Sequence, residues 1–175
     1  ANPEYVNKDT IWAHPVIQSL EEINGLELSE DKPIYHHIMN LTRRAIQYAP
    51  NHHLLAHYPL EGALDIISDM YGTEKLLTDL LIDPEGVKKS AEHTKNLWLK
   101  GFREFNALTS KTENIGGIGW AGVWAPGTTF PIQEDFSYMI SPDQFKEFCY
   151  PHIEDMVDAM EYPFYHLDGV GSLPH

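Results

Sequence analysis

The chain has 175 residues, of which 42% are hydrophobic and 22% are charged, as is typical of a globular protein with a packed core. Its 26 acidic and 12 basic residues give a net charge of −14, which disfavours nucleic acid and anionic membranes as partners. No apolar run approaches the length of a membrane span, and the start lacks the pattern of a secretory signal. The single cysteine, Cys149, excludes an internal disulfide, so we expect a cytoplasmic location.

Residues 1–50 are expected to form an amino-terminal helical extension. Pro3, Pro15 and Gly25 interrupt its first part. A capping Ser29 and a proline at position 33 then predict a helix, which Pro50 ends.

The middle of the chain predicts one strand and three helices. The run 52–58, "HHLLAHY", is apolar at its centre and closed by a proline, which favours a buried strand. Helical spacing of apolar residues then predicts helices over 62–70 and 73–82. Asp83 followed by Pro84 is a strong helix start, and this helix should continue to about residue 108.

The last third of the chain predicts two further strands and one helix. The glycine-rich run 116–124, "GGIGWAGVW", is expected to be a buried strand, followed by a long loop over 125–140. Ser141 and Gln144 form a capping box, so a helix should follow, kinked at Pro151 and ending near Met160. The run "YPFYHLD", 162–168, is the next expected strand.

This order of elements predicts an α/β fold with parallel strands and outer helices, because strands alternate with helical stretches and read as continuous apolar runs. Three parallel strands alone would leave two open edges. We therefore expect an incomplete sheet, which would self-associate or pair with a missing part of the fold.

The segment "YHLDG" holds the main catalytic candidates. Residues i and i+2 of a strand point to the same side, so His166 and Asp168 should project together. They lie at the carboxyl end of the expected strand, where ligands bind in parallel α/β folds. The carboxylate could orient the imidazole for proton transfer, or both could bind a metal ion. Equally, Asp168 could cap a turn while His166 bonds to a backbone carbonyl.

Other candidate site residues lie at neighbouring strand ends. The loop "QEDFSYM" presents Glu134, Asp135 and Tyr138, which could hold a cationic or N–H-bearing substrate or act in proton transfer, or could simply be solvated. Trp124 could stack on a flat ligand or belong to the core. His57 ends the first expected strand, much as His166 ends the last.

Two segments resemble the uroporphyrinogen decarboxylase superfamily. They are "WAPGTTFPIQEDFSYMISPDQFKEFCYPHIEDM", 124–156, and "YPFYHLDGVGSLPH", 162–175, and the run S-P-x-x-F-x-E-F-x-x-P from Ser141 to Pro151 is the most specific part. The helix start at Asp83-Pro84-Glu85 also fits, and the resemblance covers about residues 50–175. It implies that residues 51–175 form part of a (β/α)₈ TIM barrel that continues beyond the given chain.

The resemblance implies one of two chemistries. One branch of the superfamily decarboxylates a tetrapyrrole without a cofactor, with an aspartate on the pyrrole N–H groups. The other transfers methyl groups with corrinoid proteins, using zinc held by a His-x-Cys pair and a distant cysteine. Here the pair is His166-Leu167-Asp168, and Cys149 does not match the second ligand.

We therefore expect a decarboxylase-like lyase acting on a tetrapyrrole-related or other small molecule. The expected catalytic residues are His166, Asp168 and Asp135, and the expected substrate-binding residues are Glu134, Trp124, Tyr138 and His57. His166 and Asp168 are also the candidate ligands of a divalent metal ion. The alternatives are a corrinoid-dependent methyltransferase, with a corrinoid protein as partner, and a non-catalytic ligand-binding barrel or inactive fragment.

Overall fold

A computed structural model describes residues 2–5, 11–48, 54–110 and 116–168. It is mostly helical, and the described strands form three two-stranded sheets. The predicted half of a parallel TIM barrel is therefore wrong for this structure. Two of the three sheets are antiparallel, and only one pair of two-residue strands is parallel.

The amino-terminal part contains a hairpin and two helices. Strands β1 (Asn2–Tyr5) and β2 (Ile11–His14) pair antiparallel. Helix α1 (Leu20–Asn24) is capped by the Ser19 side chain, which accepts a hydrogen bond from the Glu22 amide. Helix α2 (Pro33–Tyr48) begins at the predicted proline. Both helices contact the long helix α5, so this part packs on the rest of the chain.

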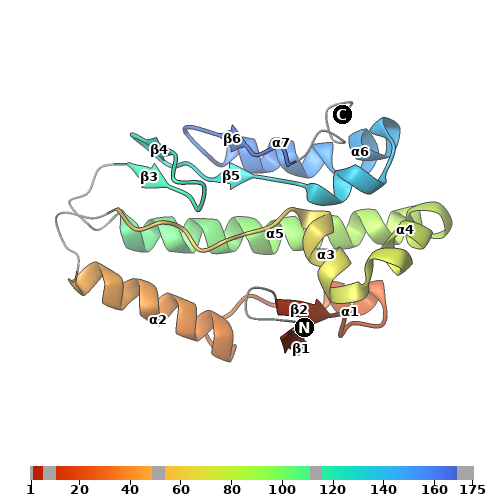
Figure 1. Cartoon of the computed structure of the whole chain (residues 1–175), viewed down its shortest axis with the longest axis horizontal. Coiled ribbons are helices and arrows are strands. Elements are labelled where there is room, and N and C mark those ends of the chain that lie inside the picture. The colour runs from red at the N-terminus through yellow and green to blue at the C-terminus, as the bar shows by residue number, and fades with distance from the viewer. Residues whose placement is uncertain (1, 6–10, 49–53, 111–115, 169–175) are drawn as a thin grey trace.

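Three helices follow at the positions that the sequence predicts. They are α3 (Ala63–Tyr71), α4 (Thr73–Ile82) and α5 (Pro84–Thr109). The Asp83 side chain caps α5 by accepting from the Gly86 amide at 3.1 Å. Figure 1 shows α5 lying lengthwise between the carboxyl-terminal elements on one side and α1 and α2 on the other.

The carboxyl-terminal part departs most from the predicted strands. Of the predicted strand 52–58, the described residues 54–58 have no regular secondary structure. The predicted strand 116–124 is instead a hairpin of β3 (Gly117–Ile118) and β4 (Trp124–Ala125). The predicted loop contains β5 (Pro131–Ile132) and the 3₁₀ helix η1 (Asp135–Met139).

The predicted helix over 141–160 forms as two helices, and the last strand is short. The capping box at Ser141 and Gln144 starts α6 (Pro142–Phe148). Helix α7 (Tyr150–Asp158) begins directly after Cys149, so the proline at 151 stands in the first turn of a new helix. Strand β6 (Phe164–Tyr165) pairs parallel with β5, Pro131 opposite Phe164 and Ile132 opposite Tyr165.

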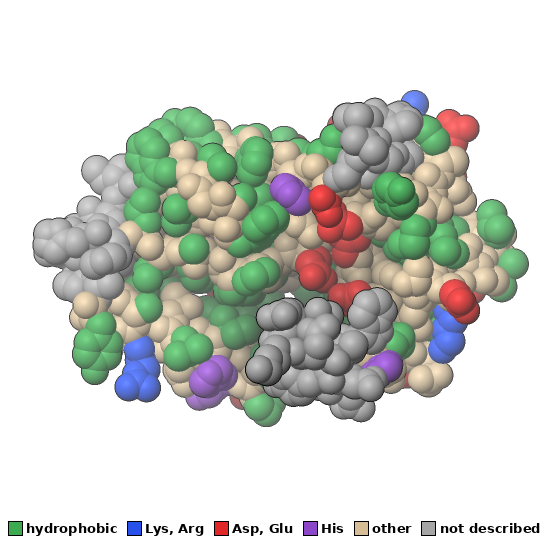
Figure 2. All heavy atoms as spheres, viewed as in Figure 1, with side chains coloured by type: hydrophobic (Ala, Val, Ile, Leu, Met, Phe, Trp, Pro, Cys, Tyr) green, Lys and Arg blue, Asp and Glu red, His purple; other side chains and the backbone are tan. Residues whose placement is uncertain are grey.

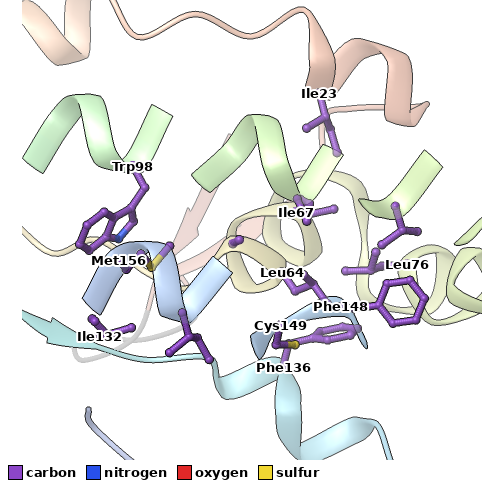
Figure 3. Close-up of a cluster of buried hydrophobic side chains, with 14 of the residues drawn as sticks. Ile23, Leu64, Ile67, Leu76, Trp98, Ile132, Phe136, Phe148, Cys149 and Met156 are labelled. Atoms are coloured by element: carbon purple, nitrogen blue, oxygen red, sulfur yellow. The ribbon is translucent and has the colours of Figure 1, made fainter. Parts of the chain in front are cut away.

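The core lies between α5 and the elements on both its sides (Figure 3). Side chains from α1, α3, α5, β5 and α7 meet there, including Ile23, Leu64, Trp98, Ile132 and Met156. Cys149 is fully buried in the same cluster, as expected for a small core residue. None of the described helices is both long and apolar enough to cross a bilayer.

Candidate functional site

The parallel pair β5–β6 brings two predicted site segments together. Because parallel strands end at the same edge, Asp135 shortly after β5 comes close to the segment that follows β6. The backbone amide of His166 donates to the carbonyl of Ile132 at 2.8 Å, which extends the pairing by one residue. The local geometry thus depends on only a few backbone hydrogen bonds.

Asp135, His166 and Asp168 interact electrostatically. Partial burial raises the pKa of Asp135, the Asp168 carboxylate raises it further, and His166 lowers it. Asp135 and Asp168 are exposed, whereas His166 is half-buried and its ring meets the edge of Trp120, with ring centroids 4.9 Å apart. The buried Nδ1 of His166 has no hydrogen-bond partner among the described residues. An aspartate with a raised pKa, a second carboxylate and an imidazole ring therefore lie near one another.

A row of further carboxylates continues from Asp135. A hollow of about 280 Å³ is lined by Asp135 together with Glu61, Asp65 and Asp69. Its lining includes neither His166 nor Asp168, which flank Asp135 outside it. Figure 2 shows acidic side chains gathered in the middle of one face with a histidine beside them, while Lys and Arg lie away from this row.

Glu61 has a raised pKa beside this hollow. Burial raises its pKa to about 7, with further contributions from the charges of Asp69, Asp65 and Asp135. Such mutual repulsion is expected where carboxylates share one hollow. We name this set, Glu61, Asp65, Asp69, Asp135 and Asp168, the acidic row.

Glu134 is buried and bound to backbone rather than presented to a ligand. Its Oε1 accepts from the amides of Leu64 at 3.0 Å and Asp65 at 3.2 Å, at the amino-terminal end of α3. Burial raises its pKa well above the usual range, and the Asp65 charge adds to this. Gly62 permits this approach, because a Cβ there would lie 2.7 Å from the Glu134 carboxyl carbon.

Asp65 makes the reciprocal contacts. Its carboxylate accepts from the amides of Asp135 at 3.0 Å, Phe136 at 2.6 Å and Gly62 at 3.1 Å. Glu134 thus caps α3 while Asp65 of α3 caps η1. We call this pair of carboxylates the cap exchange, and it fixes the backbone that carries Asp135.

The other predicted substrate-binding residues lie apart from the acidic row. Tyr138 is exposed on η1, and Trp124 is exposed on β4, where its Nε1 lies close to Gly116. His57 is 4% exposed and sits among Tyr58, Phe102, Phe105 and Phe130, far from solvent. Burial lowers the pKa of His57 to about 4, so its ring is neutral at pH 7. None of these three residues lines the acidic hollow.

The sequence-based search missed Glu61, Asp65 and Asp69. The spacing of four residues is a usable signal, because positions i and i+4 of a helix lie on one side, as Asp65 and Asp69 do on α3. This spacing alone would not have separated them from an ordinary solvated helix face.

The described residues bring no group of three or more His, Cys, Asp or Glu side chains into a metal-binding arrangement. His166 and Asp168 supply two candidate ligands, and burial raises the pKa of the Cys149 thiol, which disfavours the thiolate that zinc binds. These residues therefore do not fit the thiolate zinc site of the methyl-transfer branch.

Comparisons of the chain with models of protein families, with curated proteins and with solved structures found no match.

Proposed function

We propose that this protein is a decarboxylase-like enzyme in which Asp135, His166 and Asp168 move a proton on a small molecule. The observation that carries the proposal is the convergence of these three groups, from two distant parts of the sequence, at one end of the β5–β6 pair. Decarboxylation is also the chemistry that the resemblance to the uroporphyrinogen decarboxylase superfamily implies.

The proton-transfer roles follow from the charges. When a carboxylate leaves as CO₂, the electron pair of the broken C–C bond stays on the substrate carbon, and a proton must form the new C–H bond. Asp135 is suited to donate it, since its raised pKa keeps it protonated to higher pH than an ordinary aspartate. His166 can return the proton from solvent. The Asp168 carboxylate helps to keep Asp135 protonated, because its charge raises the Asp135 pKa.

The acidic row suits a substrate with a positively charged or N–H-bearing ring. A cationic ring accepts the electron pair that CO₂ leaves behind, and the carboxylates of Glu61, Asp65 and Asp69 stabilise positive charge beside Asp135. A tetrapyrrole-related ring with few carboxylate arms meets this description, because each further arm adds repulsion.

The test is release of CO₂ from tetrapyrrole-related carboxylic acids by the wild-type chain and three variants. We expect Asp135→Asn and His166→Ala to lose turnover by about 100-fold or more, as is typical for removal of a general acid. The exposed histidine control, His37→Ala on α2, should keep full activity. With Asp135 as the acid, the wild-type rate should fall as pH rises through its pKa. Undiminished turnover in His166→Ala, or no CO₂ release from any of these acids, would contradict the proposal.

Corrinoid-dependent methyl transfer is the second candidate. The same acidic row favours it, since methylated amines are cationic. A cobalamin titration followed by equilibrium dialysis, together with metal analysis, separates the candidates: saturable cobalamin binding favours methyl transfer, and binding of a tetrapyrrole without turnover favours a non-catalytic ligand-binding protein.

The cytoplasmic location stays a prediction that depends on the single cysteine. Self-association also stays a prediction, based on the short sheets and their open edges.

A further inference from the structure

An apolar cavity of about 280 Å³ lies between α5, α3 and the chain that follows α1. Its lining side chains are mainly aliphatic and include Leu26 and Leu28 after α1, Ile66 and Met70 of α3, and Leu97 and Trp98 of α5. Among the described residues, it shares no lining side chain with the acidic hollow. An inference from this cavity therefore stands apart from the proposed decarboxylase function.

Residues 26–28, which we call the strap, form one wall of this cavity. They have no regular secondary structure and lie at the surface, half-buried or exposed. Two side chains of α5 hold the strap. Nε2 of His93 donates to the Leu26 carbonyl at 2.8 Å, and Nζ of Lys100 donates to the Leu28 carbonyl at 2.5 Å. A wall held by such hydrogen bonds at the surface opens at low cost, because water can replace them.

The strap and the segment before α3 approach each other over Gly101, inside α5. A Cβ at Gly101 would lie 2.7 Å from the Tyr58 hydroxyl oxygen and 3.2 Å from Cδ2 of Leu28. Both Tyr58 and Leu28 line the cavity. The glycine therefore lets these two side chains pack on α5 beside the cavity, where a larger residue would push them away.

The chemistry of the lining favours an uncharged ligand. The Thr94 hydroxyl already donates to the Ser90 carbonyl of its own helix at 2.9 Å. Glu27 puts an exposed carboxylate beside the cavity, which repels a second negative charge. The described lining contains no lysine or arginine, and its apolar walls do not solvate an ion.

The size of the cavity suits an aliphatic chain. An apolar cavity of about 150 Å³ lined by Leu, Ile and Phe stays free of water and binds benzene. The cavity beneath the strap has nearly twice that volume, which gives room for roughly eight to ten carbons. We propose that it binds one aliphatic chain of this length with an uncharged head group, and that the strap is the lid that opens to admit the chain.

The direct test is titration of the full chain with 1-alkanols of increasing length, followed by tryptophan fluorescence, because Trp98 lines the cavity. From 1-butanol to 1-octanol, each added methylene should tighten binding about threefold to fourfold. The gain should stop by 1-dodecanol, because the cavity is then full. Affinity that rises steadily through 1-dodecanol, or 1-octanol that does not saturate the signal, would overturn the proposal. Octanoate that binds as tightly as 1-octanol would overturn the uncharged head group.

A variant that fills the cavity tests its position. Leu97→Phe adds volume to the wall and should weaken 1-octanol binding about tenfold or more. The matched control is Leu81→Phe, the same change at a side chain that is 75% exposed on α4, and it should leave binding unchanged. Circular dichroism checks that both variants stay folded, and the alkanol series in the wild type decides if Leu97→Phe does not. Equal weakening by the two substitutions would contradict the site.

The lid is tested by rates. His93→Phe combined with Lys100→Met removes both hydrogen bonds to the strap and keeps side chains of similar size. In stopped-flow fluorescence, this double variant should take up and release 1-octanol several-fold faster than the wild type. Lys89→Met, the control, changes an exposed lysine earlier in α5 and should leave both rates unchanged. Wild-type rates in the double variant would show that the strap is not the lid.

Discussion

Glu134 and Asp135 are adjacent in sequence and occupy opposite environments. Glu134 is 2% exposed and bound to backbone amides of α3, whereas Asp135 is exposed beside His166 and Asp168. Both carboxyls have raised pKa values, and burial is the largest cause in each. The difference is that Glu134 is buried and accepts hydrogen bonds from backbone amides, while Asp135 is exposed to solvent. A raised pKa therefore does not by itself separate an acid that binds backbone amides from one that faces solvent.

Asp65 belongs to both the cap exchange and the acidic row. Substitutions of Asp65 therefore best test the difference between an acid that binds backbone amides and one that faces solvent. Its carboxylate accepts three backbone amides and also lines the hollow. The structural role and the electrostatic role can be separated by comparing it with Asp69, one helical turn later, which lines the same hollow on the exposed side of α3.

The largest effect is expected for Asp65→Ala. It leaves the amides of Gly62, Asp135 and Phe136 without their acceptor, and should lower the free energy of unfolding by about 3–5 kcal/mol. Urea unfolding followed by circular dichroism measures this. Asp69→Ala, the control, should change it by less than about 0.5 kcal/mol. Equal effects of the two substitutions would show that Asp65 is an ordinary member of the acidic row.

A smaller effect is expected for Glu134. Here the acceptor oxygen and the volume of the side chain matter more than its negative charge. Glu134→Gln keeps an oxygen that can accept from Leu64 and Asp65, so it should cost only about 1 kcal/mol. Glu134→Ala removes the acceptor and opens a cavity, at a cost of about 3 kcal/mol. The same unfolding measurement tests both variants. If Glu134→Gln were as damaging as Glu134→Ala, the negative charge itself would be needed at α3.

A pH-dependent effect is expected for Glu61. Because its pKa is about 7 in the folded chain and 4.5 in its ordinary state, the folded chain binds more protons than the unfolded chain between these values. Its contribution to stability is therefore present at low pH and is lost as pH rises from about 4.5 to 7. Glu61→Gln should flatten this part of the pH profile of urea midpoints, and most of the difference should appear above pH 7. Parallel profiles for the wild type and the variant would rule out this assignment.

Local signals in the sequence predicted the helices well. Asp83 with Pro84 starts α5, and Ser141 with Gln144 starts α6, because a cap is made by residues three or four positions apart in the chain. Helices α3 and α4 followed from apolar spacing for the same local reason. The strands were the failures. Short apolar runs such as 116–124 do not specify a pairing partner, and the glycines there allow a hairpin as readily as one long strand.

The sequence by itself determined where helices α2 to α6 begin and that the chain is strongly acidic. It also singled out Asp135, His166 and Asp168 as candidates. Only the tertiary structure decided which acids bind the backbone and which face solvent, since Glu134 and Asp65 find their amide partners about 70 residues away in the chain. Likewise, the meeting of Asp135 with His166 depends on the pairing of β5 with β6. Contacts between distant segments leave no periodic trace in either segment, which is why residue spacing alone could not predict them.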